Sequence, residues 1–129
     1  MKMKNIMTIG LLTVITLLTG CAANEIRSGA QDIIVTRTVA PKSCKFKGQI
    51  MGEQGGFLTG GWTSNKNLAQ GAMNDMKNHA YELNANYVVL EESKAGNTGS
   101  GSIWSHNTRQ TDVTQVGNAY RCPPADIGL

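Results

Sequence analysis

The sequence has few aromatic and few charged residues. These two shortages limit the size of its hydrophobic core and the ligands that it can bind through charge. Aromatic residues make up 5% and charged residues 16% of the 129 residues. Two Trp, three Tyr and two Phe can fill only a small hydrophobic core. The twelve basic residues include Lys2 and Lys4, and without these two the remaining ten nearly balance nine acidic residues, with no Lys/Arg cluster. This composition argues against a protein that binds nucleic acid through a basic surface.

The sequence also lacks the short motifs that mark common active sites. It has no Cys-x-x-Cys pair, and its Gly-rich window at 52–61 contains no Gly-Lys-Ser/Thr step for a phosphate. No Ser is flanked by a strand-turn-helix elbow, and Ser64 is better placed as a helix cap. We therefore expect a protein that is not an enzyme, with no catalytic residue, metal or cofactor.

Asp75 and His79 are the best candidates for chemistry if this expectation fails. They are four residues apart, so a helix places them on one face, where a carboxylate can orient an imidazole as a general base. The same spacing is more often a surface pair that contributes a few tenths of a kcal/mol. His106 and Asp112 add possible metal ligands, but the two histidines are too widely separated for a recognised spacing. A small periplasmic ligand-binding or hydrolytic domain that uses these residues remains an alternative.

The N-terminus carries the clearest signal for cellular location. An apolar run over residues 6–18 follows two lysines and is shorter than the roughly 20 residues of a membrane-spanning helix. It ends in Leu18-Thr19-Gly20-Cys21, which resembles the lipobox of bacterial lipoproteins. That resemblance implies cleavage before Cys21, lipid on its thiol and a firm membrane anchor. Ala22, where an Asp would suggest retention at the inner membrane, favours the outer membrane, with the domain facing the periplasm.

These signals divide the chain into a signal peptide at 1–20, a lipidated tether at 21–31 and one domain at 32–129. With Cys21 assigned to lipid, Cys44 and Cys122 remain as a pair in an oxidising compartment, and we infer a disulfide between them. It would close a loop of about 79 residues and contribute about 4–5 kcal/mol relative to the reduced unfolded chain. A metal-binding or redox role for this pair is the alternative.

The sequence of the first half of the domain predicts two strands and a loop. Residues 33–39 are almost all β-branched and are followed by Pro41, which predicts a strand. A second strand is expected at 44–51. Five glycines then crowd residues 52–61, which predicts a flexible loop that carries Phe57 and Trp62.

The second half predicts one helix and two further strands. Apolar residues at helical spacing predict a helix over 66–83, capped by Ser64 or Asn65. The apolar face is formed by Leu68, Ala69, Ala72, Met73, Met76, Ala80 and Leu83.

The residues after the helix complete the predicted fold. Asn84-Ala85-Asn86 is expected to turn the chain into a buried strand at 87–90, because Asn tolerates left-handed backbone geometry. A Gly/Ser-rich loop is expected at 93–110 and a last strand at 112–122. The fold class is therefore α+β, in the order β-β-α-β-β, with one helix packed on an antiparallel-rich sheet.

Phe57, Trp62 and Trp104 are the candidate partner-binding residues, because aromatic side chains in Gly-rich loops often anchor a partner. The alternative is that both Trp side chains fold back onto the sheet. The function expected from these features is a lipid-anchored interaction, accessory or sensor module that binds an envelope protein. A structural part of an envelope-spanning assembly, such as a secretion-system core, is the runner-up.

A family resemblance supports this expectation. Cys44 with Gly48, the sequence LNANYVVL at 83–90 and the sequence GNAYRC at 117–122 resemble small Gram-negative lipoproteins of unknown function. That family is similar to the outer-membrane stress-sensor lipoprotein of the Rcs envelope pathway, and the resemblance implies a non-enzymatic envelope role. The Rcs sensor differs in having two disulfides and a long Pro-rich tether, whereas this chain has one cysteine pair and about ten tether residues.

Overall fold

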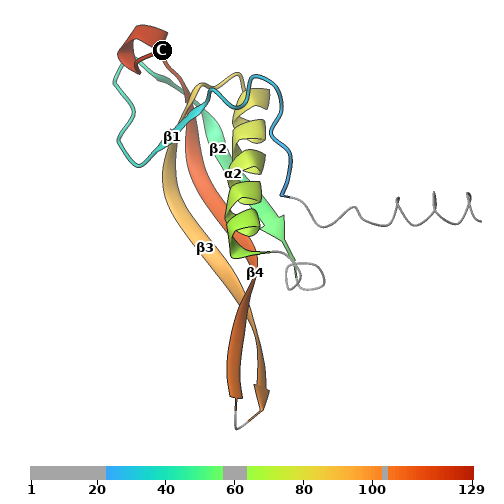
Figure 1. Ribbon diagram of the computed structural model, residues 1–129. Helices are drawn as coiled ribbons and strands as arrows, with labels where there is room; N and C mark the ends of the chain where they lie inside the picture. Colours follow the sequence, from blue (N-terminus) through green and yellow to red (C-terminus); the bar gives the residue numbers. More distant parts are fainter. Residues whose placement is uncertain (1–22, 57–63, 103–104) are drawn as a thin grey trace, which may run out of the picture.

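The computed structural model describes residues 23–56, 64–102 and 105–129, and for residues 97–102 and 105–109 it describes only the backbone. The elements are β1 (Ile34–Thr36), β2 (Lys45–Gly55), α2 (Asn65–Glu82), β3 (Tyr87–Ser102), β4 (Ser105–Arg121) and a short 3₁₀ turn, η2 (Pro124–Asp126). Figure 1 shows α2 lying along one face of the sheet, while the β3–β4 hairpin extends well past the helix. The prediction of a small α+β domain with one helix is confirmed.

The sheet has four strands in the order β1-β3-β4-β2. β4 pairs antiparallel with both β2 and β3, whereas β1 runs parallel to β3 through the pairs Ile34–Tyr87 and Thr36–Val89. The sheet is therefore mixed. β1 is also shorter than the strand predicted over 33–39, because the β-branched residues after Thr36 find no partner strand in this sheet.

The helix begins and ends within one residue of its prediction. Ser64 is the cap, and its hydroxyl accepts a hydrogen bond from Asn67 N at 3.2 Å. Asn84 has φ of 55°, so the predicted left-handed turn after the helix is confirmed. Ala69 is exposed, contrary to its predicted place in the core. The buried face instead includes a glycine, in the set Leu68, Gly71, Ala72, Met76 and Ala80.

The Gly-rich window does not begin as a loop, which corrects the prediction over its first part. β2 continues to Gly55, so Gly52 lies inside the strand, opposite Gln115 of β4. A Cβ built on Gly52 would lie 2.5 Å from Met76 N and would also meet the Ala72 carbonyl oxygen. Gly52 is therefore where the backbone of α2 comes closest to the sheet.

The predicted loop at 93–110 is wrong for the part of the chain that the structure describes. β3 and β4 pair antiparallel there from Ser93–Gln115 to Ser102–Ser105, with one register shift between Gly96 and Asn97. Gly, Ser and Asn have low strand propensity, but pairing with a neighbouring strand satisfies the backbone and outweighs that preference. The hairpin passes the end of β2, whose last pair with β4 is Gly55–Asp112.

The hydrophobic core has a main part between α2 and the sheet and a smaller part on the opposite face of the sheet. The main cluster contains Ala30, Ile33, Ile50, Met76, Ala80, Ala85, Val88 and Ala119. The smaller cluster gathers Tyr87, Val89 and Cys122, with Cys44 packed against it. Cys44 and Cys122 form a disulfide with an S–S distance of 2.04 Å. They flank the Lys45–Arg121 pair, so the disulfide closes the end of the β2–β4 ladder.

Candidate functional site

Residues 24–33, which we call the strap, lie against the folded domain and do not form the free tether predicted over 21–31. Asn24 N donates to Gln54 Oε1 at 2.7 Å, and its side-chain amide donates to Glu53 O at 2.9 Å. The Asn74 amide in turn donates to Asn24 O at 2.7 Å. Asn24 is therefore fixed to both β2 and α2.

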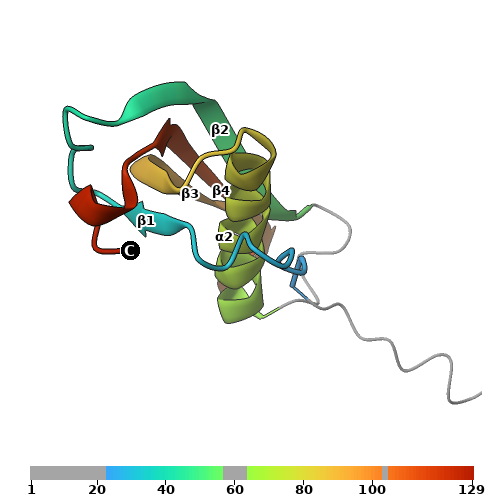
Figure 2. The same ribbon diagram turned by 90° about the horizontal axis from the view of Figure 1, so that it is seen from above.

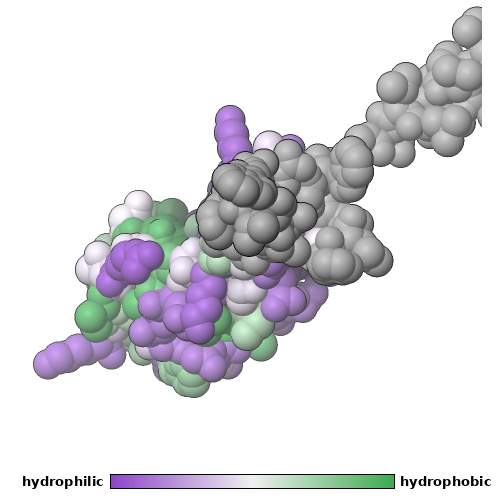
Figure 3. All heavy atoms as spheres, turned by 90° about the horizontal axis from the view of Figure 1, so that it is seen from below, coloured by the Kyte–Doolittle hydropathy of each residue, from purple (hydrophilic) through white to green (hydrophobic). Residues whose placement is uncertain are grey.

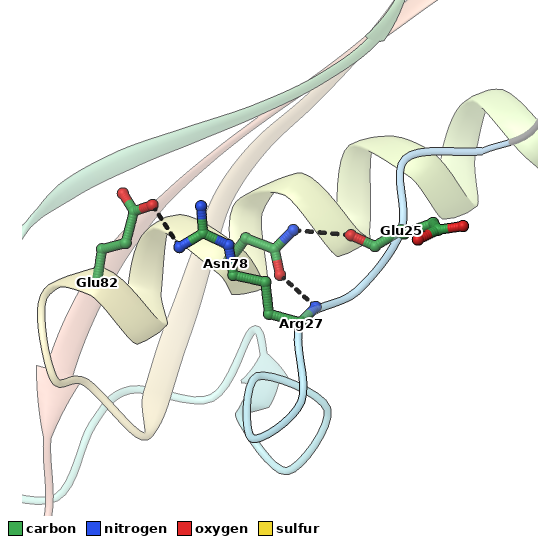
Figure 4. A network of polar contacts seen from close by, with 4 residues as sticks. All are labelled: Glu25, Arg27, Asn78 and Glu82. Carbon is green, nitrogen blue, oxygen red and sulfur yellow. Dashed lines mark hydrogen bonds and ion pairs between the residues drawn. The ribbon is translucent and has the colours of Figure 1, made fainter.

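Figure 4 shows how the next part of the strap is held by the helix. The Asn78 side chain donates to Glu25 O and accepts from Arg27 N, each at 2.9 Å. The Arg27 guanidinium also pairs with the Glu82 carboxylate at 2.8 Å. These two charged side chains are 57% and 50% exposed, so the pair contributes little beyond orientation. The amide of Asn78 is the central polar contact.

The strap also contributes apolar side chains to the core. Ala30 is fully buried, Ile33 is 4% exposed, and Ile26 packs against the same cluster. Lys77 Nζ donates to Gln31 O at 3.0 Å. Figure 2 shows the strap in blue beside α2, well away from the red C-terminal turn. The folded body therefore begins at Asn24, earlier than the position 32 expected from the sequence.

Asp75 and His79 both bind the backbone of β2. Asp75 Oδ2 accepts from Glu53 N at 2.9 Å, and His79 Nδ1 lies 2.6 Å from the carbonyl oxygen of Met51. A carbonyl only accepts, so the Nδ1 of His79 carries the proton. The two side chains do lie on one helix face, as predicted, but each is used to attach α2 to the strand.

This attachment covers an exposed strand edge. β2 is the last strand of the sheet, and among the described residues no strand pairs with its outer side. The N–H of Glu53 binds Asp75 and its C=O binds Asn24, so both outward-facing groups of this residue have side-chain partners. Unpaired edges promote strand addition between molecules, and covering them prevents it. Asp75 and Asn24 therefore protect this part of β2.

The other candidates for chemistry are not brought together. Within the described ranges, no group of three His, Cys, Asp or Glu side chains is placed to hold a metal ion. The carboxylate of Asp112 packs over Gly96 and accepts from the Thr111 hydroxyl at 3.1 Å. The side chain of His106 is outside the described residues.

Two surface depressions lie at opposite ends of the β2–β4 ladder. One, of about 270 Å³, is lined by residues 53–55 of β2, by Gly56 directly after it and by residues 111–114 of β4. The other, of about 290 Å³, is lined by Ser43, Lys45 and residues 121–124 beside the disulfide. Asp75 and His79 line neither, so the helix pair is not part of either depression.

The predicted lipid and partner sites lie outside the described residues. Cys21 precedes them, Phe57 and Trp62 fall between β2 and α2, and Trp104 falls between β3 and β4. The sequence patterns did not predict the contacts of the strap. Asn74 and Asn78 were the available signal, because Asn is a poor helix former and two of them one turn apart suggest side-chain partners.

A search of the described residues finds no helix that is both long enough and apolar enough to cross a bilayer. Residues 24–122 match the model of a family described as "Domain of unknown function (DUF4156)". The chain is also 24% identical over 115 residues to "Uncharacterized protein YjeI" from Escherichia coli K12, from Escherichia coli O6:H1 and from Shigella flexneri. These alignments cover 88% of this chain and 93% of each relative. No solved structure matches.

Proposed function

We propose that this chain, which belongs to the family described as "Domain of unknown function (DUF4156)", is a lipoprotein of the outer membrane that acts by binding another envelope protein. The observation that carries the proposal is the tetrapeptide Leu18-Thr19-Gly20-Cys21 behind a short apolar run. Lipid on Cys21 would anchor the domain, which faces the periplasm. The role is that of an accessory or sensor module and not of an enzyme.

The geometry of the helix pair supports a non-enzymatic role. A general base must reach a substrate proton, and His79 lines neither of the two depressions, while its Nδ1 is bound to the carbonyl of Met51. Asp75 is turned toward Glu53 N and does not orient the imidazole. The two groups best suited to catalysis are thus engaged in holding the fold.

The resemblance to the Rcs sensor supports only the proposed location and the general role. A sensor that threads through a barrel protein needs a long flexible tether. Here the strap is docked from Asn24 onward, so only Ala22 and Ala23 separate the anchor from the folded domain. We therefore favour a partner that lies within reach of the membrane surface.

The anchor is tested by separating membranes from soluble periplasm for the wild type and for Cys21→Ser. The wild type should remain with outer membranes and carry acyl mass on Cys21, whereas the variant should be soluble or unprocessed. Wild-type protein found in the soluble fraction without added mass would contradict the anchor.

The binding role is tested by crosslinking in intact cells followed by purification. We expect a stoichiometric envelope protein to be recovered with the wild type. Trp62→Ala and Trp104→Ala should reduce that recovery tenfold or more, which corresponds to about 1.4 kcal/mol. His79→Ala is the matched control and should leave recovery unchanged. Loss of function in His79→Ala alone, in a folded protein, would instead favour the ligand-binding or hydrolytic alternative.

A further inference from the structure

We propose that the strap holds the domain directly against the lipid headgroups, with the C-terminal half of β2 and the adjacent side of α2 turned toward the membrane. This inference rests on the lipid anchor of the proposed function. It adds which surface of the domain meets the bilayer and how closely.

The first step is the reach of the chain between anchor and domain. Residues are separated by at most about 3.6 Å along an extended chain, so three steps from Cys21 to Asn24 span no more than about 11 Å. A free tether of about ten residues would extend to about 35 Å. The docked strap therefore removes most of the distance that the domain could otherwise move from the bilayer.

The second step is how firmly the end of the strap is fixed. Asn24 makes three hydrogen bonds, to Gln54, Glu53 and Asn74, and these residues belong to two different elements. The strap then continues into the Asn78 contacts and the buried Ala30. A segment held at its end and along its length cannot swing as a linker does, so its exit point determines which surface lies nearest the anchor.

The third step is the chemistry of that surface. The groups that bind Asn24 directly are uncharged, since Gln54 and Asn74 contact it through their side-chain amides and Glu53 through its backbone carbonyl. Glu25 and Glu53 are exposed residues at these contacts, so the surface also carries negative charge. Amides can hydrogen-bond phosphate and ester oxygens. Figure 3 shows hydrophilic and hydrophobic residues interspersed on the part of the lower face that the grey atoms leave visible. Such a surface fits a headgroup layer that the protein touches without inserting.

The fourth step follows from the length of β2. Lys45 is eight residues from Glu53, and at about 3.4 Å per residue the two ends are about 27 Å apart. The end of the sheet that carries the disulfide and Arg121 is thus far from the attachment point. That end is therefore not the surface that the strap holds nearest the anchor.

The test uses the full lipidated protein in a supported bilayer of phosphatidylethanolamine and phosphatidylglycerol, measured by neutron reflectometry. The wild-type protein layer should begin at the headgroups without a layer of water between them. Insertion of about ten Gly/Ser residues between Ala23 and Asn24 should open a hydrated gap, because such a linker has an average span of about 17 Å. The same residues added after Leu129 are the matched control and should leave the wild-type profile unchanged.

The possible outcomes separate the two proposals. A wild-type layer with a hydrated gap as wide as that of the insertion variant would overturn the membrane-facing surface and leave the anchor intact. Failure of the wild type to stay on the bilayer, together with no acyl mass on Cys21, would overturn both.

Discussion

Replacing Gly52 by Ala should weaken the contact between α2 and β2 more than any other single methyl group added to the strand. The new Cβ would lie 2.5 Å from Met76 N and 2.6 Å from Met76 Cβ, and it would also meet the Ala72 carbonyl oxygen. Two of these atoms belong to the helix backbone, which cannot move aside as a side chain can. The helix must therefore shift away from the strand by about 1 Å to restore ordinary contact distances.

The expected cost has two parts. Overpacking of this kind costs about 1–3 kcal/mol. A shift of about 1 Å also lengthens the bonds from Asp75 to Glu53 N and from His79 to Met51 O, at about 1 kcal/mol each. Gly52→Ala should thus lower the free energy of unfolding by about 3–5 kcal/mol, a large part of the stability of a small domain.

Urea unfolding followed by far-UV circular dichroism measures this loss, with the disulfide intact in every sample. Gln49→Ala is the matched control, because Gln49 is an exposed residue of the same strand, and its effect should stay within about 0.5 kcal/mol. If Gly52→Ala unfolds within that same range of the wild type, the close approach of helix and strand is not what stabilises this contact.

Three further perturbations test other features of the fold. Cys44→Ser should lower the free energy of unfolding by about 4–5 kcal/mol, since the disulfide closes a long loop, and urea unfolding of the reduced wild type should show the same loss. Two free thiols in freshly isolated wild type would disprove the bond. His79→Ala and Asp75→Ala should each lower the free energy of unfolding by about 1 kcal/mol in thermal or urea unfolding through the lost contacts with β2, whereas Asp75→Asn, which keeps an acceptor oxygen, should lower it less. Equal losses for Asp75→Ala and Asp75→Asn would show that charge matters more than the hydrogen bond. Asn84→Ala should cost about 1 kcal/mol because φ is 55° there, and Asn84→Gly should be close to neutral, so a more stable Ala variant would contradict the left-handed turn.

The parts of the fold that depend on local sequence were predictable. The helix at Asn65–Glu82 follows from apolar spacing and from the Ser64 cap, both of which act within a few residues. Asn84 determines the turn after it for the same reason. The start of β3 at Tyr87 is also as expected, because a short apolar run after a turn is typical of a buried strand.

The parts that depend on distant partners were not predictable. The β3–β4 hairpin beyond Gly96 is rich in Gly and Ser, and only its pairing with the opposite strand shows that it is extended. Gly52 was assigned to a loop for the same reason, because its role is to let Met76 and Ala72 approach. A glycine required by a neighbouring helix and a glycine of a flexible loop are identical in the sequence.

In the candidate site, too, the local features were predictable and the contacts with distant residues were not. Asp75 and His79 were correctly placed on one helix face, but the groups they bind belong to a strand more than 20 residues earlier. The strap was expected to be free because it is polar and aperiodic. Its polar atoms are satisfied by Asn74 and Asn78, which lie 50 or more residues further along the chain.

The separation of the strap from its partners has a consequence for the order in which the chain assembles. The strap binds residues 29 to 55 positions later, and β1 pairs in parallel with β3, which begins after the helix. Neither segment can dock until β2, α2 and β3 have formed, although both are synthesised first. Contacts of such long range form late, because closing large loops costs entropy. In the lipoprotein proposed above, the enzyme that attaches lipid at Cys21 during export would therefore meet an extended chain, and the contacts that later restrain the domain would form only after the cysteine has been accessible.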